Sequence, residues 1–217
     1  MNAIIRPATS SDDCQAVGET YFQAYYGLSW FQHVNAEVNP EDVKNLMSTI
    51  ASVLLEQSNG LVLVAEQDGQ IVGHLMAWER ANVHAWELEN GSKNPYYNPR
   101  VTTNLRGRTF SRWVDQQAGI RKFAEQVEGQ HGRFMFVDTI AVLPQFQHQG
   151  IGRKLFEHAT ESARQSNLAL ALVSPQESLQ ACEKLRLAPM SNPIVSRDDD
   201  RFQVGRSSSL PECHRES

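Results

Sequence analysis

The segment from Gln147 to Arg153 has residue types and a spacing that suit the binding of an anion. Gly150 and Gly152 carry no side chains that would keep an anion away from the backbone. They stand just before an apolar-periodic stretch, which is where a helix begins. The N-terminus of a helix offers unpaired backbone N–H groups and a partial positive charge, and both favour phosphate. Arg153 and Lys154 add positive charge in the first turn, where a bound anion would compensate it.

Three glycine patterns that bind phosphate differ in spacing, and the chain fits one of them. The P-loop pattern G-x-x-x-x-G-K-[ST] does not occur in the sequence. The dinucleotide pattern needs a third glycine at the position of Leu155, so it fails as well. The remaining pattern, [QR]-x-x-G-x-[GA], is matched in full by Gln147-His148-Gln149-Gly150-Ile151-Gly152. A second interpretation stays open, in which the two glycines only allow a helix to pack tightly against a strand.

A strand before this loop and a helix after it must hold it in place. Residues 133–142 form the most strongly apolar segment and are predicted as a strand that stops before Pro144. Residues 168–173 are predicted as another buried strand. The helix between them has one apolar side, formed by Leu155, Phe156, Ala159 and Ala163.

The remaining elements predict a mixed α/β sheet, because strands alternate with helices and one hairpin is present. Residues 80–130 are polar and are interpreted as an insertion, part loop and part helix. The other predicted elements are a strand at 3–6, a helix ending at Tyr26, a helix starting at Pro40, hairpin strands at 61–65 and 70–78 around Asp68-Gly69, a helix over about 110–127, a short helix at 177–186 and a last strand near 201–204.

Length and composition exclude several classes of protein. The 217 residues fit one domain, assigned to 1–206 with the insertion, followed by a flexible tail at 207–217. There is no long apolar run and no secretory leader, so we expect a cytoplasmic protein without a membrane partner. Three separated cysteines form no CxxC pair, so no metal site is expected. A net charge of -5 argues against a nucleic-acid partner.

The segment FVDTIAVLPQFQHQGIGRKLFEHA resembles the acetyl-CoA-binding motif of the GCN5-related N-acetyltransferase (GNAT) superfamily. The resemblance extends to the early helices, the hairpin at 61–78 and the strand–helix unit at 168–187. The helical insertion that leads into Gly132-Arg133-Phe134 looks like a branch common in filamentous fungi. This resemblance implies an N-acetyltransferase that transfers an acyl group, most simply acetyl from acetyl-CoA, directly to a primary amine.

The family resemblance also implies where the cofactor lies. The sheet would splay between the strands at 134–143 and 168–173, and the pantetheine arm would enter the gap. There it would pair with backbone groups of Ile140, Ala141 and Val142. The pyrophosphate would bind the backbone amides of the loop, which are those of Gln147, His148, Gln149, Gly150, Ile151, Gly152 and Arg153. No metal is implied.

The residues that move protons are less clear from the sequence. Asp138 is an acid inside an apolar strand, so it is a candidate base, and burial would raise its pKa. The alternative is an aspartate that is paired or exposed. Glu79 is a second candidate base. Many GNAT enzymes carry a tyrosine acid after the fifth strand, and this sequence has Cys182 there. Cys182 is either the acid or a buried thiol without a role. The backbone N–H of Val142 is the expected donor to the thioester carbonyl.

The acceptor is not identified by the sequence. It is expected to be a small molecule or a peptide that carries an amine, and a homodimer stays an open alternative. An aromatic group formed by Tyr25, Tyr26, Trp30 and Phe31 either lines the acceptor pocket or packs in the core. The alternative function is an acyl-CoA-binding sensor with little catalysis. A nucleotide-binding protein that uses the same helix end is a third hypothesis.

Overall fold

The structure is a computed structural model that describes residues 3–35, 38–80, 95–102, 108–175, 188–189 and 202–208. Its elements in chain order are β1 (Ile4–Pro7), α1 (Ser11–Tyr25), α2 (Ser29–Asn35), α3 (Pro40–Glu56), β2 (Gly60–Gln67), β3 (Gln70–Arg80), η1 (Pro95–Tyr97), α5 (Pro99–Thr102), α6 (Arg108–His131), β4 (Phe134–Val142), η2 (Pro144–Phe146), α7 (Ile151–Gln165), β5 (Ala169–Pro175), β6 (Ala188–Pro189) and β7 (Phe202–Ser208).

The strands form one mixed sheet, which confirms the predicted fold class. In the described part of the chain its order is β1-β2-β3-β4-β5-β7-β6. Every neighbouring pair is antiparallel except β4 and β5, which are parallel. The parallel pair is joined through α7, as a βαβ crossover requires. β4 is therefore a central strand with a different kind of neighbour on each edge.

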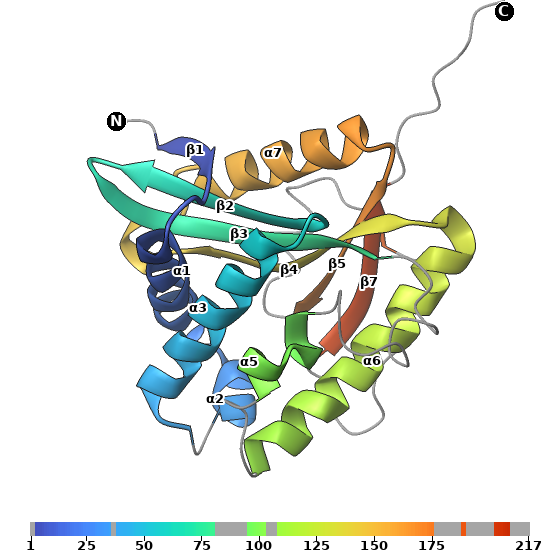
Figure 1. Cartoon of the computed structure of the whole chain (residues 1–217), viewed down its shortest axis with the longest axis horizontal. Coiled ribbons are helices and arrows are strands. Elements are labelled where there is room, and N and C mark those ends of the chain that lie inside the picture. The colour runs from blue at the N-terminus through green and yellow to red at the C-terminus, as the bar shows by residue number, and fades with distance from the viewer. Residues whose placement is uncertain are drawn as a thin grey trace, which may run out of the picture.

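Helices cover both faces of the sheet (Figure 1). α7 packs on one face against β2, β3 and β4, where Leu155 and Ala159 are fully buried. α1 and α3 cover the other face, against which Val17 of α1 and Met47 and Ile50 of α3 are fully buried. α6 joins the core on the face of α1 and α3 through apolar residues such as Phe123. The helical periodicity read from the sequence thus corresponds to faces that are buried on the sheet.

A β-bulge lies in the middle of β4. Met76 of β3 pairs with Thr139, but Ala77 pairs with Val137, so Asp138 is the extra residue. A bulge of this kind points two successive side chains towards one face of the sheet. Asp138 and Thr139 accordingly both face α1, where Thr139 is hydrogen bonded to the buried His74.

β4 and β5 separate directly after this point. Their parallel pairing runs from Phe134 with Ala169 to Val137 with Leu172 and then ends, although both strands continue. Bulges increase the local twist and bend the strand that carries them. Beyond the bulge the two strands are no longer hydrogen bonded, and this unpaired region between β4 and β5, called the gap below, lies where the family resemblance implies a splayed sheet.

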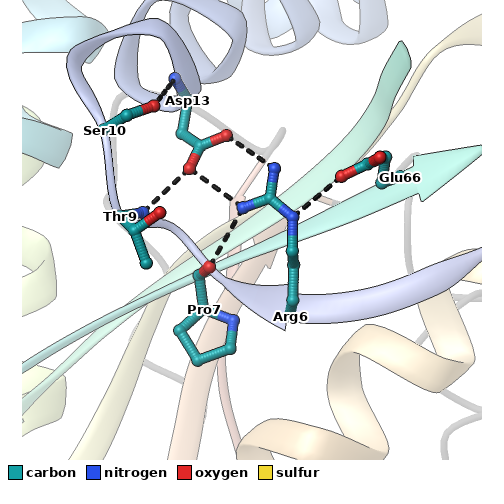
Figure 2. Close-up of polar contacts among 6 residues, drawn as sticks. All are labelled: Arg6, Pro7, Thr9, Ser10, Asp13 and Glu66. Carbon is teal, nitrogen blue, oxygen red and sulfur yellow. Dashed lines mark hydrogen bonds and ion pairs between the residues drawn. The ribbon is translucent and has the colours of Figure 1, made fainter. Parts of the chain in front are cut away.

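The start of α1 is held to the sheet by a charged cluster (Figure 2). The Arg6 guanidinium makes two hydrogen bonds of 2.9 Å to the carboxylate of Asp13 and one of 2.8 Å to Glu66 on β2. Asp13 also accepts a bond from the backbone N–H of Thr9, and its own N–H donates to the hydroxyl of the N-cap Ser10. These bonds fix the direction in which α1 leaves β1.

Several elements differ from the sequence predictions or lie outside the described residues. α2, η1 and α5 were not expected, because segments this short carry too few periods to reveal a helix. The last strand was expected near 201–204, and β7 continues through Ser208, past the expected start of the tail at 207. The predicted helix at 177–186 lies outside the described residues.

The cluster in Figure 2 gives a test of stability. Replacement of Arg6 by Met should lower the free energy of unfolding by about 1–3 kcal/mol, because it leaves the buried Asp13 carboxylate without its cation. Urea denaturation at pH 7 measures this loss. The matched control is Arg164→Met, which removes an exposed pair with Glu161 and should cost much less than the loss of Arg6.

The same pair predicts a pH dependence. The hydrogen bond from Arg6 lowers the pKa of Asp13 from 3.8 to about 2. A carboxyl group with a lowered pKa stabilises the fold above its unfolded value, and this contribution is lost as the pH falls through its folded value. The stability difference between wild type and Arg6→Met should therefore shrink between about pH 4 and pH 2. A difference that stays constant over this range would contradict the assignment.

Candidate functional site

The loop between β4 and α7 presents a helix N-terminus to solvent. The chain leaves β4, makes the short turn η2 and reaches Gly150, the N-cap of α7. Gly150 has φ 81°, in the left-handed region that favours glycine. His148 also has a positive φ, of 62°. This backbone turns the chain abruptly into the helix.

No described side chain caps the start of α7. The first helical hydrogen bond runs from the N–H of Lys154 to the carbonyl of Gly150. The N–H groups of Ile151, Gly152 and Arg153 precede it, so they have no acceptor inside the helix. Gly150 is exposed and a Cβ on it would meet nothing within 4 Å. No side chain at Gly150 blocks the approach of an anion to these amides, and the anion site itself stays a prediction from the sequence.

The side chains of this loop are exposed or bonded to neighbouring groups. His148 and Gln149 are exposed. The guanidinium of Arg153, interpreted from the sequence as a partner for an anion, forms a 2.7 Å surface ion pair with Glu157. Gln147 donates from its side-chain amide to the carbonyl of Val142, at 3.0 Å. The loop is thus tied back to the end of β4.

One edge of β4 faces the gap beside β5. The N–H of Leu143 donates to the carbonyl of Val72 on β3, so the backbone groups of Leu143 point towards β3. Because backbone groups alternate along a strand, those of Val142 and Ile140 point to the opposite edge. Ala141 points towards β3, where its carbonyl oxygen lies 2.8 Å from the position of a Cβ on Gly73. The structure thus brings the polar backbone groups of Ile140 and Val142 to the gap, but not those of Ala141.

Asp138 lies on the α1 side of this edge. Part of its surface is accessible, yet its carboxyl group is enclosed by protein. Its Oδ2 accepts a 2.7 Å hydrogen bond from the hydroxyl of Tyr96 in η1. Burial raises the pKa of Asp138 from 3.8 to about 7, although the Tyr96 bond and the charge of Arg80 oppose the shift. The carboxyl group can therefore gain or lose a proton near neutral pH.

Two further phenol groups lie near Tyr96 on this side of β4. The pKa of Tyr21 is raised by burial and by the charges of Tyr25 and Asp138. The pKa of Tyr96 is raised first by burial and then by the charge of Asp138. The hydroxyl of Tyr25 donates to the carbonyl of Ile140 at 2.7 Å. The sequence analysis did not name Tyr96, although a paired aspartate was one of its alternatives for Asp138.

A buried histidine supports the bulge from β3. His74 is fully buried, and burial lowers its pKa to about 3, so its ring is neutral. Its Nδ1 contacts the hydroxyl of Thr20 on α1, and its Nε2 lies 3.2 Å from the hydroxyl of Thr139. Thr20 also donates to the carbonyl of Val17. This chain of bonds connects α1, β3 and β4 at the bulge, and a sequence reading had no signal for it.

Other candidates from the sequence do not join this site. Glu79 forms a 2.8 Å ion pair with Arg133 at the end of β3, opposite Met135. Phe31 is buried in the core, while Tyr26 is exposed. Cys182 lies outside the described residues.

Two features are absent from the described residues. No group of three or more His, Cys, Asp and Glu side chains in them is placed to hold a metal ion. None of the helices in this part of the chain has both the length and the apolar character to cross a membrane.

Comparison with known proteins connects this geometry to a family. Residues 105–184, which run from the start of α6 past β5, match the sequence model of the Acetyltransferase (GNAT) family. The chain has the GNAT fold, and its residues 105–184 carry the GNAT sequence pattern. The matched stretch includes the bulge, the gap and the loop before α7. No curated protein matches the sequence. The narrower resemblance to a filamentous-fungal branch stays a prediction.

Solved structures of GNAT enzymes superpose over nearly the whole chain. An agmatine N-acetyltransferase mutant in its apo form has 13% identity and a TM-score of 0.60, covering 97% of this chain and 100% of its own. The Drosophila melanogaster polyamine N-acetyltransferase has 14% identity and a TM-score of 0.55, and the match covers 95% of this chain and 96% of that enzyme. The PaiA N-acetyltransferase from Thermoplasma acidophilum, solved with coenzyme A, has 12% identity and a TM-score of 0.53, covering 97% and 100%. At these identities the likeness concerns the fold.

The contact between Tyr96 and Asp138 gives a direct test of the site. Tyr96→Phe removes a hydrogen bond that favours the charged carboxylate, so the pKa of Asp138 should rise further above about 7. A lost bond of about 1.4 kcal/mol would make the acid tenfold weaker. Titration of the carboxyl carbon of Asp138 by NMR measures this change. A pKa that falls or stays the same in the variant would contradict the described geometry.

Proposed function

We propose that the protein is an acetyl-CoA-dependent N-acetyltransferase that transfers an acetyl group directly to a primary amine. The observation that carries the proposal is the arrangement of three features along one path. These are the uncapped N-terminus of α7, the gap edge of β4 and the carboxyl group of Asp138. They supply an anion site, a backbone edge and a proton acceptor in the order that acyl transfer from CoA needs.

The diphosphate of CoA would bind at the start of α7. The amides of the loop from Gln147 to Arg153 and the helix dipole favour its negative charge. Gly150 and Gly152 leave room for the phosphate oxygens. This binding uses the backbone, which agrees with the surface pairing of Arg153 to Glu157.

The pantetheine arm would lie along the gap edge of β4. Amide groups on this arm would pair with the backbone of Ile140 and Val142, as an added strand does. The carbonyls of these two residues accept bonds from Tyr25 and Gln147 in the free protein. Those side chains would give up or share their bonds when the arm binds. The thioester carbonyl would then approach the backbone N–H of Val142, the donor that polarises it.

Asp138 would accept the proton that the amine loses. A general base works best when its pKa lies close to the working pH, and the pKa of Asp138 is about 7. Direct transfer needs no covalent enzyme intermediate, because the amine attacks the thioester carbonyl itself. Tyr96 holds the carboxyl group in place from η1.

The acceptor proposed here is a small molecule with a cationic amine. A carboxylate among aromatic rings attracts a cation through its charge and through the ring faces. Two structural neighbours carry names for agmatine and polyamine acetylation, which agrees with this class. A peptide amine is the other acceptor that the sequence allows. A cytoplasmic location and a homodimer also stay proposals from the sequence.

A second candidate function is an acyl-CoA-binding sensor with little catalysis. It is favoured by Cys182, which occupies the position where the family resemblance expects a tyrosine acid. A thiol-release assay with acetyl-CoA and a panel of polyamines, amino acids, arylamines and peptides separates the two functions. CoA binding without turnover on any acceptor would favour the sensor.

A pair of substitutions at Gly150 tests the anion site. Gly150→Asp places a carboxylate beside the diphosphate and should weaken CoA binding at least tenfold by calorimetry, or about 1.4 kcal/mol. Gly150→Asn has a similar size and tolerates a positive φ, so it controls for backbone strain and should bind CoA several times more tightly than the aspartate variant. Equal affinity of both variants and wild type would exclude the loop as the phosphate site.

The proposed base predicts the pH dependence of the reaction. In wild type, kcat/KM should fall as the pH drops below about 7, because protonated Asp138 cannot accept a proton. Asp138→Asn should lower kcat about 10²-fold or more and remove this acidic limb. Glu79→Gln is the matched control, because Glu79 is paired with Arg133 away from the bulge. An unchanged acidic limb in Asp138→Asn would show that another group is the base.

A further inference from the structure

Tyr25 brings a phenol from the end of α1 to the gap edge of β4. Its hydroxyl lies 2.7 Å from the carbonyl oxygen of Ile140, to which it donates. The alternation along β4, fixed by the bond from Leu143 to Val72, turns this carbonyl towards the gap. The phenol therefore stands at the edge along which the thioester arm would lie.

The same phenol belongs to the group around the proposed base. The ring of Tyr25 lies 4.9 Å from that of Tyr21, centre to centre. The charges of Tyr25 and Asp138 both act on the pKa of Tyr21 and on that of Tyr96. A proton donor and a proton acceptor are thus placed two residues apart along the bulge, at Ile140 and Asp138.

Acyl transfer needs both of these groups. When the carbon–sulfur bond breaks, the sulfur leaves as a thiolate and must gain a proton. We propose that Tyr25 is the catalytic residue that donates this proton to the sulfur of CoA. This inference rests on the proposed acetyl transfer, and it assigns to α1 a role that sequence reasoning sought in Cys182.

In the proposed step, one proton moves from the amine to Asp138 and another from Tyr25 to the sulfur. The nitrogen lone pair of a neutral amine forms a bond to the thioester carbon, and the nitrogen proton passes to the Asp138 carboxylate. The carbon–sulfur bond breaks with its electron pair on sulfur, and the sulfur takes the proton of the Tyr25 hydroxyl. Water then returns the proton from Asp138 to the Tyr25 phenolate. The products are the acetylated amine and CoA with a free thiol.

The contact in the free protein fits this role. The carbonyl of Ile140 is a neutral acceptor, and hydrogen bonds to an ionised acceptor are about twice as strong. A developing thiolate therefore competes well for the Tyr25 proton. Until then, the bond to Ile140 holds the phenol at the edge of the gap.

The test compares two neighbouring tyrosines. Tyr25→Phe should lower kcat about a hundredfold or more, with the affinity for CoA and the urea midpoint close to those of wild type. Tyr26→Phe is the matched control, because Tyr26 is the next residue and 54% exposed, and it should keep the wild-type kcat. The assay is thiol release from acetyl-CoA with the best amine of the panel.

A more acidic phenol separates a proton donor from a structural tyrosine. A donor must be protonated, so the wild-type kcat should fall at alkaline pH. 3-Fluorotyrosine placed at position 25 should move this alkaline limb to lower pH, and Tyr25→Phe should lack it. The fluorotyrosine variant keeps both the ring and the hydroxyl, so it also serves if Tyr25→Phe does not fold.

The outcomes separate the role of Tyr25 from the proposed acetyltransferase activity. An unchanged kcat in Tyr25→Phe, or weaker CoA binding at an unchanged kcat, overturns the role of Tyr25 and leaves the acetyltransferase proposal intact. An alkaline limb that fluorotyrosine does not move also overturns it. Wild-type protein that binds CoA but acetylates no amine of the panel overturns both proposals.

Discussion

The extra residue in β4 is the constraint on which the rest of the site depends. Because Asp138 has no partner in β3, β4 bends there, and its pairing with β5 ends at Val137. The same bulge turns the side chains of Asp138 and Thr139 towards α1. One local irregularity thus sets both where the pairing of β4 with β5 ends and on which face of the sheet the carboxyl group of Asp138 lies.

Three elements hold β4 at the bulge and just after it, and each contacts a different residue of the strand. Tyr96 from the insertion binds the carboxyl group of Asp138, His74 from β3 contacts Thr139, and Tyr25 from α1 binds the carbonyl of Ile140. Burial of Asp138 costs stability, because folding raises its pKa and the charged form is disfavoured. The contribution of Asp138 to stability therefore falls as the pH rises from about 4 to about 7. The fold accepts this cost and keeps a carboxyl group that can exchange a proton near neutral pH.

The proposed phosphate site depends on a different kind of interaction. At the start of α7 the polar groups belong to the backbone, and Gly150 in the left-handed region sets their direction. The side chains of the loop are exposed or paired elsewhere, as Arg153 is with Glu157. Backbone geometry thus fixes one end of the proposed cofactor site, and buried side chains fix the other.

The sequence by itself determined the longer elements and the position of the glycine loop before α7. The hairpin, the strand at 134–142, the helix after Gly152 and the mixed sheet follow from patterns that extend over a few neighbouring residues. Asp138 was recognisable as an acid in an apolar strand. Only the tertiary structure decided that it titrates near neutral pH, that Tyr96 binds it, that Tyr25 binds the nearby carbonyl of Ile140 and that Ala141 faces away from the gap. These facts depend on contacts between residues 42 and 115 positions apart and on a one-residue shift in strand register. A local pattern holds no information about either.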